Sequence, residues 1–180
     1  MRLASMVSSS APRGAGLFSI GLGWVLTLAW GCFSPAALAG ESSGPVPALS
    51  LESALKAARA ALARCEADGY RVTVTVVDAG GTVKAVLRGD GAGPHTTDSS
   101  RKKAYTSASL RRSTRELSEL VVKIPRLHSL GRMNDEILLL GGGLPIRQGE
   151  RVVGGIGVGG APGDSLDEAC ARAGLEALQP

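Results

Sequence analysis

The stretch VTVTVVDAGGTVKAVL, residues 72–87, decides the fold. In its first half Val72, Val74 and Val76 alternate with threonines, and a second alternation begins at Val83 after the glycine-rich sequence DAGG. An alternation with a period of two residues is typical of β-strands, and a glycine-rich turn between two such runs predicts a β-hairpin. The chain is therefore expected to contain an antiparallel sheet.

A helix is predicted before this hairpin, over residues 51–67, because apolar residues recur there at spacings of three and four. Ser50 is a suitable N-cap, and Gly69 is a suitable residue to end the helix. The apolar stripe consists of Leu51, Leu55, Ala58, Leu62 and Cys65.

After the hairpin, the glycines and proline of residues 89–94 predict a loop. The pattern then becomes helical over residues 97–110, breaks at 111–113, and resumes as a second helix for which Thr114 is a good N-cap.

The last third of the chain predicts two or three more strands and a final helix. The expected strands are residues 137–140, 144–147 and 151–158, with a tight turn at 148–150. The final helix carries an apolar face, has Asp164 or Ser165 as its cap, and places Asp167 and Glu168 at its positive N-terminal end. The order α-β-β-α-α-β-β-α, with hairpins in place of βαβ crossovers, predicts an α+β fold in which helices cover an antiparallel sheet.

The N-terminus has the pattern of a cleavable signal peptide. Arg2 and Arg13 precede an uncharged apolar run at residues 17–30, which ends near the small residues Ala37-Leu38-Ala39. We therefore expect residues 1–39 to be a signal peptide, 40–49 a flexible tail rich in Gly, Ser and Pro, and 50–180 a single domain. This organisation predicts a secreted or periplasmic protein.

Composition and charge disfavour nucleic acid as a partner. Only 3% of the residues are aromatic, which leaves few side chains for stacking on bases. The formal net charge is +4, and two of these charges belong to Arg2 and Arg13 in the predicted signal peptide.

Two cysteines, Cys65 and Cys170, remain after the predicted cleavage, and both fall on apolar helix faces. They form a disulfide if the first and last helices are neighbours, and are buried free thiols otherwise.

The most unusual segment is the start of the helix after the loop, which is rich in hydroxyl groups and positive charge. Between Ser99 and Arg115 there is no acid, and the cations suit a carboxylate, a phosphate or propionate groups; the alternative is a solvated helix face. The six cations are Arg101, Lys102, Lys103, Arg111, Arg112 and Arg115.

Candidate metal ligands are sparse. His95 and His128 are the only histidines, and no carboxylate cluster accompanies them. Hard oxygen ligands for a surface ferric-iron site are conceivable at Asp90, Asp98 and the pair Asp135-Glu136, while the simpler interpretation is solubility. No nucleophile with its base is recognisable, so the residues alone predict no reaction.

Four blocks, in order, resemble the haem-binding GlcG/HbpS-like family, whose members are related to the C-terminal domain of PduO-type corrinoid adenosyltransferases. The resemblance spans about residues 50–178. The blocks are VTVVDAGG at 74–81, RGDGAGP at 88–94 leading to KAYT at 103–106, GGGLPI at 141–146, and GGIGVGGAPG at 154–163 followed by DEACA at 167–171.

The resemblance implies a profilin-like antiparallel sheet with helices, assembly into homo-oligomers that are often octamers, and binding of haem or a related tetrapyrrole. It ties Thr106 to haem coordination, although His95 is chemically the better axial donor. Lys103, Lys102 and Arg101 are the expected partners of the haem propionates. Members of the secreted branch also hold iron, and some act beside a membrane sensor kinase in redox signalling.

The leading hypothesis is an exported protein that sequesters or senses haem without turnover. The first alternative is a haem-degrading enzyme, for which no catalytic residue is recognisable. The second is a corrinoid-binding or structural module, with cobalamin the less favoured ligand.

Overall fold

Four strands form one antiparallel sheet in the order β2-β1-β4-β3 in the computed structural model, which describes residues 48–179. The predicted α+β fold, a sheet covered by helices, is confirmed. The elements are α1 (Leu51–Ala67), β1 (Thr73–Asp78), β2 (Val83–Arg88), α2 (Thr96–Leu110), α3 (Thr114–Lys123), the 3-10 helix η1 (Pro125–Arg132), β3 (Gly143–Gln148), β4 (Arg151–Gly159) and α4 (Asp164–Glu176). The predicted signal peptide and most of the predicted tail lie outside the described residues.

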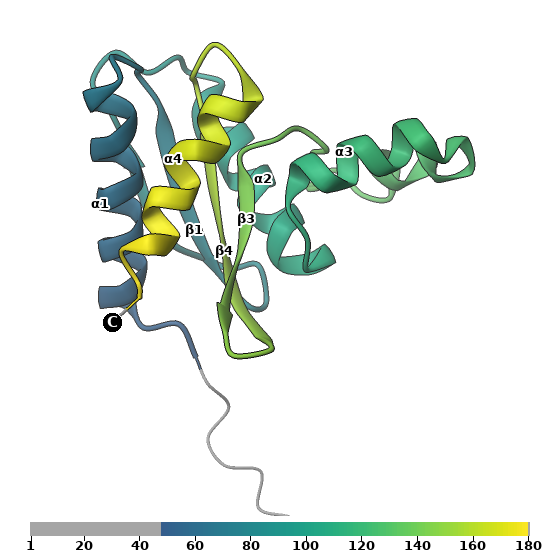
Figure 1. The fold of residues 1–180 in the computed structure, drawn as a ribbon, viewed down its shortest axis with the longest axis horizontal. Coiled ribbons are helices and arrows are strands. Elements are labelled where there is room, and N and C mark those ends of the chain that lie inside the picture. Colours follow the sequence, from purple (N-terminus) through teal and green to yellow (C-terminus); the bar gives the residue numbers. More distant parts are fainter. Residues whose placement is uncertain (1–47, 180) are drawn as a thin grey trace, which may run out of the picture. The chain divides into compact units, whose positions relative to one another are not determined.

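The two-residue period of β1 separates the two faces of the sheet. Val74 and Val76 are fully buried in the main core, which includes residues of α1 and α4. Thr73 and Thr75 point to the opposite face and are also fully buried, because α2 covers them and their hydroxyls bond to it. The sheet therefore lies between α1 and α4 on one side and α2 on the other (Figure 1).

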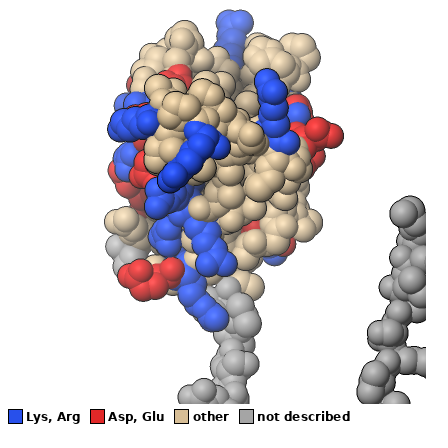
Figure 2. Space-filling view, turned by 90° about the vertical axis from the view of Figure 1, so that its right-hand side faces the viewer, with Lys and Arg blue, Asp and Glu red and all other residues tan. Residues whose placement is uncertain are grey.

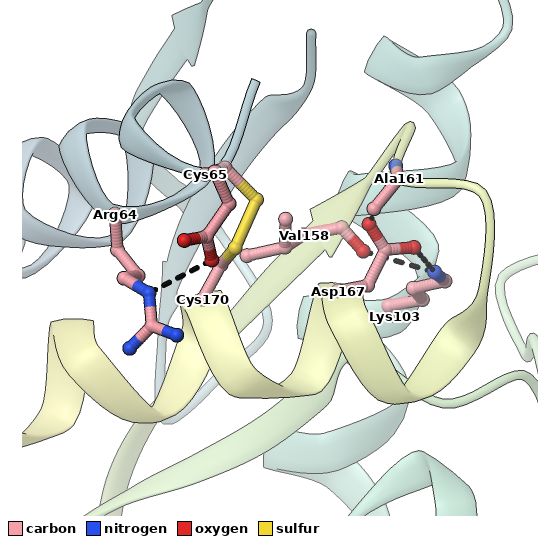
Figure 3. The surroundings of a disulfide bond; sticks show 8 residues. Arg64, Cys65, Lys103, Val158, Ala161, Asp167 and Cys170 are labelled. Atoms are coloured by element: carbon pink, nitrogen blue, oxygen red, sulfur yellow. Dashed lines mark hydrogen bonds and ion pairs between the residues drawn. A yellow bond between two sulfur atoms is a disulfide. The ribbon is translucent and has the colours of Figure 1, made fainter. Parts of the chain in front are cut away.

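The structure joins Cys65 of α1 to Cys170 of α4 in a disulfide (Figure 3). The two Cα atoms are 5.5 Å apart, and the residues are separated by 105 positions in the sequence. Both cysteines are fully buried, so the bond lies inside the core that the two helices share.

The strand predicted at residues 137–140 is wrong, because these residues form no strand in the structure. The open edges of the sheet belong to β2 and β3, and residues 137–140 pair with neither of them. The backbone N–H of Leu138 instead donates to the Thr106 hydroxyl of α2. An apolar run that suits a strand is therefore held here by a helix side chain.

Two predicted helix caps are also wrong. Ser113, not Thr114, is the N-cap of α3 and accepts from the Glu116 N–H, while the Thr114 hydroxyl accepts from the Gly143 N–H of β3. The residue before α4 is Gly163, which offers no side-chain cap. The predicted Ser50 cap of α1 is confirmed by a 3.0 Å bond from the Ser53 N–H.

Helices α3 and η1 form an arm that projects from the sheet and its covering helices (Figure 1). No residue of η1 is buried, and Val122 of α3 is 74% exposed. The side of the domain from which the arm projects carries a band of Lys and Arg side chains, with Asp and Glu at its margins (Figure 2). Within residues 48–179, none of the helices has the length and apolar character needed to cross a membrane.

Candidate functional site

Helix α2 is held unusually close to the sheet by glycines at alternate positions of β4. A Cβ atom on Gly157 would lie 2.1 Å from the Ser100 carbonyl oxygen, and one on Gly155 would lie 2.3 Å from the Ala104 carbonyl oxygen. Only glycine allows the two backbones to approach in this way. The Thr75 and Ser100 hydroxyls share a 2.8 Å hydrogen bond at the same contact, so the basic, hydroxyl-rich helix is fixed directly on the sheet.

Lys103 of α2 is buried in an ion pair with Asp167 of α4 (Figure 3). Its Nζ donates to Asp167 Oδ2 at 2.7 Å and to the Val158 carbonyl at 2.9 Å, and the Ala161 N–H donates to the second carboxylate oxygen. Burial raises the pKa of Asp167, and the Lys103 ammonium acts in the opposite direction. Because Lys103 is 1% exposed and already paired, it is not available to a haem propionate as we expected.

Thr106 is fully buried below the segment that follows the arm. Its hydroxyl accepts from the Leu138 N–H at 2.9 Å and lies 3.5 Å from the Glu136 carbonyl oxygen. In this conformation the Thr106 hydroxyl holds residues 136–138 against α2. It can contact a ligand only if these residues move away from α2.

Arg101 and Lys102 lie nearer the surface, and each is paired with a carboxylate. Arg101 bonds to Glu136, at 3.3 Å for one of the two contacts, and to Asp98 at 3.1 Å, while Lys102 bonds to Asp98 at 2.9 Å. The Lys102 ammonium and the Arg101 guanidinium lower the pKa of Asp98, and the hydrogen bond from Arg101 lowers that of Glu136. Arg101 thus fastens α2 to the segment that covers Thr106.

We expect this fastening to weaken in acid. Both carboxyl groups have a folded-state pKa below their ordinary values of 3.8 and 4.5, so their contribution to stability is present above pH 4.5 and is lost as the pH falls below 3.8. Melting temperatures of the wild type and Arg101→Gln should therefore differ most near neutral pH and converge as the pH falls through the folded-state pKa values of Asp98 and Glu136. A difference in melting temperature that does not shrink as the pH is lowered would show that these ion pairs do not stabilise the fold.

The two histidines lie apart from any acidic cluster that could form a metal centre among the described residues. His95 is exposed immediately before α2, and His128 is exposed on η1. Among residues 48–179 no group of three His, Cys, Asp or Glu side chains is arranged to hold a metal ion. Of the acids considered for ferric iron, Asp98 and Glu136 share Arg101.

The side of the sheet that carries α2 also exposes apolar surface. Val86 of β2 is 41% exposed and lies opposite Thr75 in the ladder, so its side chain is on the α2 side of the sheet. Tyr105 of α2 is half-buried and packs over the turn between β1 and β2, at Gly81. Tyr105 lies one helical turn after Arg101 on α2, so this side of the sheet offers both apolar surface and positive charge, which suit a molecule that combines an apolar body with negative groups.

The sequence did not reveal Asp167 as the partner of Lys103. It assigned Asp167 only to the positive end of the last helix, whereas the carboxylate turns inward to Lys103, 64 residues away in the sequence. No local pattern connects two such residues. The sequence around Lys103 indicated a basic, hydroxyl-rich helix, but not which cation was buried.

Several solved structures share this fold. The crystal structure of a double mutant of Streptomyces reticuli HbpS is 42% identical, with a TM-score of 0.72 over 82% of this chain and 98% of that chain. The crystal structure of a PduOC:haem complex is 28% identical, with a TM-score of 0.67 over 73% of this chain and 95% of that chain.

Proteins of similar sequence point to the same group of relatives. An uncharacterized 15.0 kDa protein of the dhaT-dhaS intergenic region of Citrobacter freundii is 34% identical over 121 residues, which are 67% of this chain and 85% of that protein. Corrinoid adenosyltransferase PduO of Citrobacter freundii is 29% identical over 117 residues, which are 64% of this chain but only 35% of PduO.

The family model described as "Haem degrading protein HbpS-like" matches residues 49–176, which include every helix and strand described above. Because this match covers well over half of the chain and agrees with the predicted resemblance, the protein belongs to the HbpS-like family.

Proposed function

We propose that this protein is an exported haem-binding protein that sequesters or senses haem without turning it over. The observation that carries the proposal is its likeness, in sequence and in fold, to a PduOC:haem complex. The disulfide between Cys65 and Cys170 supports export, because disulfides persist mainly in oxidising compartments.

The α2 side of the domain has side chains that suit haem. Haem is a flat apolar ring with two carboxylates and supplies an iron that accepts axial ligands. Val86 and Tyr105 provide apolar contact, and Arg101 and Lys102 provide positive charge. Since both cations are already paired with Asp98 or Glu136, propionates would take the place of these acids.

For the iron ligand we favour His95 over Thr106. The imidazole of His95 is exposed and suits haem iron chemically, whereas the Thr106 hydroxyl is neutral, buried and bonded to Leu138. We assign Thr106 a positioning role, in which it holds residues 136–138 against α2.

A haemin titration of the purified protein, followed at the Soret band, tests the proposal. We expect a saturable shift in the wild type and at least about tenfold weaker binding, with an altered Soret position, in His95→Ala, because an axial bond is lost. His128→Ala is the matched control and should bind like the wild type. Thr106→Val, which removes the hydroxyl and keeps the shape, should weaken binding less and leave the Soret position unchanged.

Three outcomes of this titration would contradict the proposal or its assignment. Absence of a saturable shift in the folded wild type would refute haem binding. Equal loss in the His95 and His128 variants would refute the assigned ligand. A changed Soret position in Thr106→Val would indicate that Thr106, and not His95, is the iron ligand.

The family description itself favours one alternative, a haem-degrading enzyme. With a reductant and dioxygen present, such an enzyme would abolish the Soret band and release iron, whereas a binding protein keeps the band. The PduO relatives favour a corrinoid-binding or structural module as a second alternative, which the same titration with cobalamin in place of haemin distinguishes.

We further propose that the protein assembles into homo-oligomers, with octamers as the expected size, and is secreted or periplasmic. A membrane sensor kinase as its partner in redox sensing, and iron bound by surface acids, belong to the same proposal. Light scattering on the purified protein tests the assembly, because a mass of one subunit would exclude it.

A further inference from the structure

The six cations between Ser99 and Arg115 separate into two groups in the structure. Four of them meet a carboxylate within 4 Å: Lys103 meets Asp167, Arg101 meets Asp98 and Glu136, Lys102 meets Asp98, and Arg115 meets Asp164 and Glu168. For Arg111 and Arg112, residues 48–179 supply no carboxylate within this distance. The excess positive charge of this region therefore lies at the junction of α2 and α3.

Arg111 and Arg112 line a pocket of about 280 Å³ beside the edge strand β3, and α4 forms another wall. Arg147 of β3 lines it too and is likewise without a carboxylate partner among the described residues. The apolar wall consists of Leu144, Pro145 and Leu175. The three guanidinium groups therefore meet at one hollow of the surface, where they can act together on a single anion.

The pocket also holds two acids and a fourth arginine. Glu168 bonds to Arg115 at 3.1 Å and to Arg172 at 3.0 Å, so its charge is already neutralised. Glu116, on the first turn of α3, is exposed and leaves the pocket with a positive balance.

Arg147 is held in place by the backbone around it. Its guanidinium donates to the Arg111 carbonyl at 2.8 Å and to the Glu150 carbonyl at 3.3 Å. These bonds use two of its five N–H donors and leave the others for a ligand. A guanidinium that is already oriented loses less entropy when it binds an anion.

Arg111 adopts a backbone conformation that usually belongs to glycine. Its φ of 58° at the C-cap of α2 is the one positive φ of a non-glycine residue in the described part of the chain. Glycine is the common residue at such a helix end and would carry no strain. Strained residues cluster at functional sites. An arginine at this position costs some backbone strain and adds a positive charge to the pocket.

We infer that Arg111, Arg112 and Arg147 form a binding site for a small multivalent oxyanion, either phosphoryl or carboxylate. The planar guanidinium group matches both kinds of anion, because it donates two parallel hydrogen bonds to two oxygens. Without an anion the three like charges repel one another, so binding also removes a destabilising interaction. The inference does not depend on haem, and its test contains none.

Calorimetric titrations with inorganic pyrophosphate and with citrate, at constant ionic strength, test the site in the purified protein. We expect saturable binding of at least one of these anions, and its identity tells a phosphoryl ligand from a carboxylate ligand. Arg112→Gln removes a side chain that makes no hydrogen bond to the described residues, so it should weaken binding about tenfold without affecting the fold. Arg126→Gln, on the exposed η1, changes the net charge equally and should leave binding unchanged.

Arg111→Asn provides a second, independent readout, because asparagine tolerates the left-handed conformation better than arginine. This variant should bind the anion about tenfold more weakly and yet melt at the same or a higher temperature than the wild type. Absence of saturable binding of both anions would overturn the inference. Equal weakening by Arg112→Gln and Arg126→Gln would also overturn it, since the effect would then be one of net charge.

Discussion

Replacing Lys103 with methionine should lower the free energy of unfolding by about 3–5 kcal/mol, because Asp167 would remain buried without its cation. The neighbouring Lys102→Met removes a cation from an exposed pair with Asp98, and should cost less than about 1 kcal/mol. Urea unfolding of both variants, followed by circular dichroism, measures this difference.

A third variant separates the missing charge partner from the missing side chain. Lys103→Met combined with Asp167→Leu removes both charges and should recover much of the lost stability, because apolar groups of similar volume often replace a buried ion pair without cost. If Lys103→Met is no more destabilising than Lys102→Met, the pair does not connect α2 to α4 as described.

Opening the disulfide should lower the free energy of unfolding by about 2–5 kcal/mol. The bond joins residues 105 positions apart, so it constrains the unfolded chain strongly. Urea unfolding of the wild type with and without a reductant measures the loss. The variant with both Cys65→Ala and Cys170→Ala is the control, because its stability should not change when the reductant is added.

Peptide mapping without reduction gives the direct check of the disulfide. The peptide that contains Cys65 should be recovered linked to the peptide that contains Cys170. Recovery of both cysteines as free thiols, alkylated after unfolding, would contradict the disulfide and also remove one support for export.

Much of the fold was predictable because its signals are local. The helix at 51–67 and the hairpin over residues 72–87 follow from apolar periods of 3.6 and 2 residues, and both are confirmed. The strand predicted at 137–140 was wrong because the backbone of this apolar run bonds to a helix hydroxyl and pairs with neither open edge of the sheet, β2 or β3. A period reports which face is buried, not which partner covers it.

The candidate site was predicted less well, for the same physical reason. Charge alone placed Lys103 and Arg101 in one basic segment, and the structure buries the first and leaves the second near the surface. Arg147, which completes the basic pocket, was recognised only as part of a strand. Its relation to Arg111, 36 residues earlier, exists only after the sheet and α2 have packed together.

By itself, the sequence determined the order of helices and strands, the antiparallel sheet and the membership of the HbpS-like family. All three depend on periods and motifs that are read within a few residues. Only the tertiary structure decided which cations are neutralised and which remain available, because each pairing joins residues from separate elements. Lys103 pairs with Asp167 of α4, whereas no carboxylate of the described residues lies within ion-pair distance of Arg111 or Arg112. Under our inference, this difference decides where a negatively charged ligand binds.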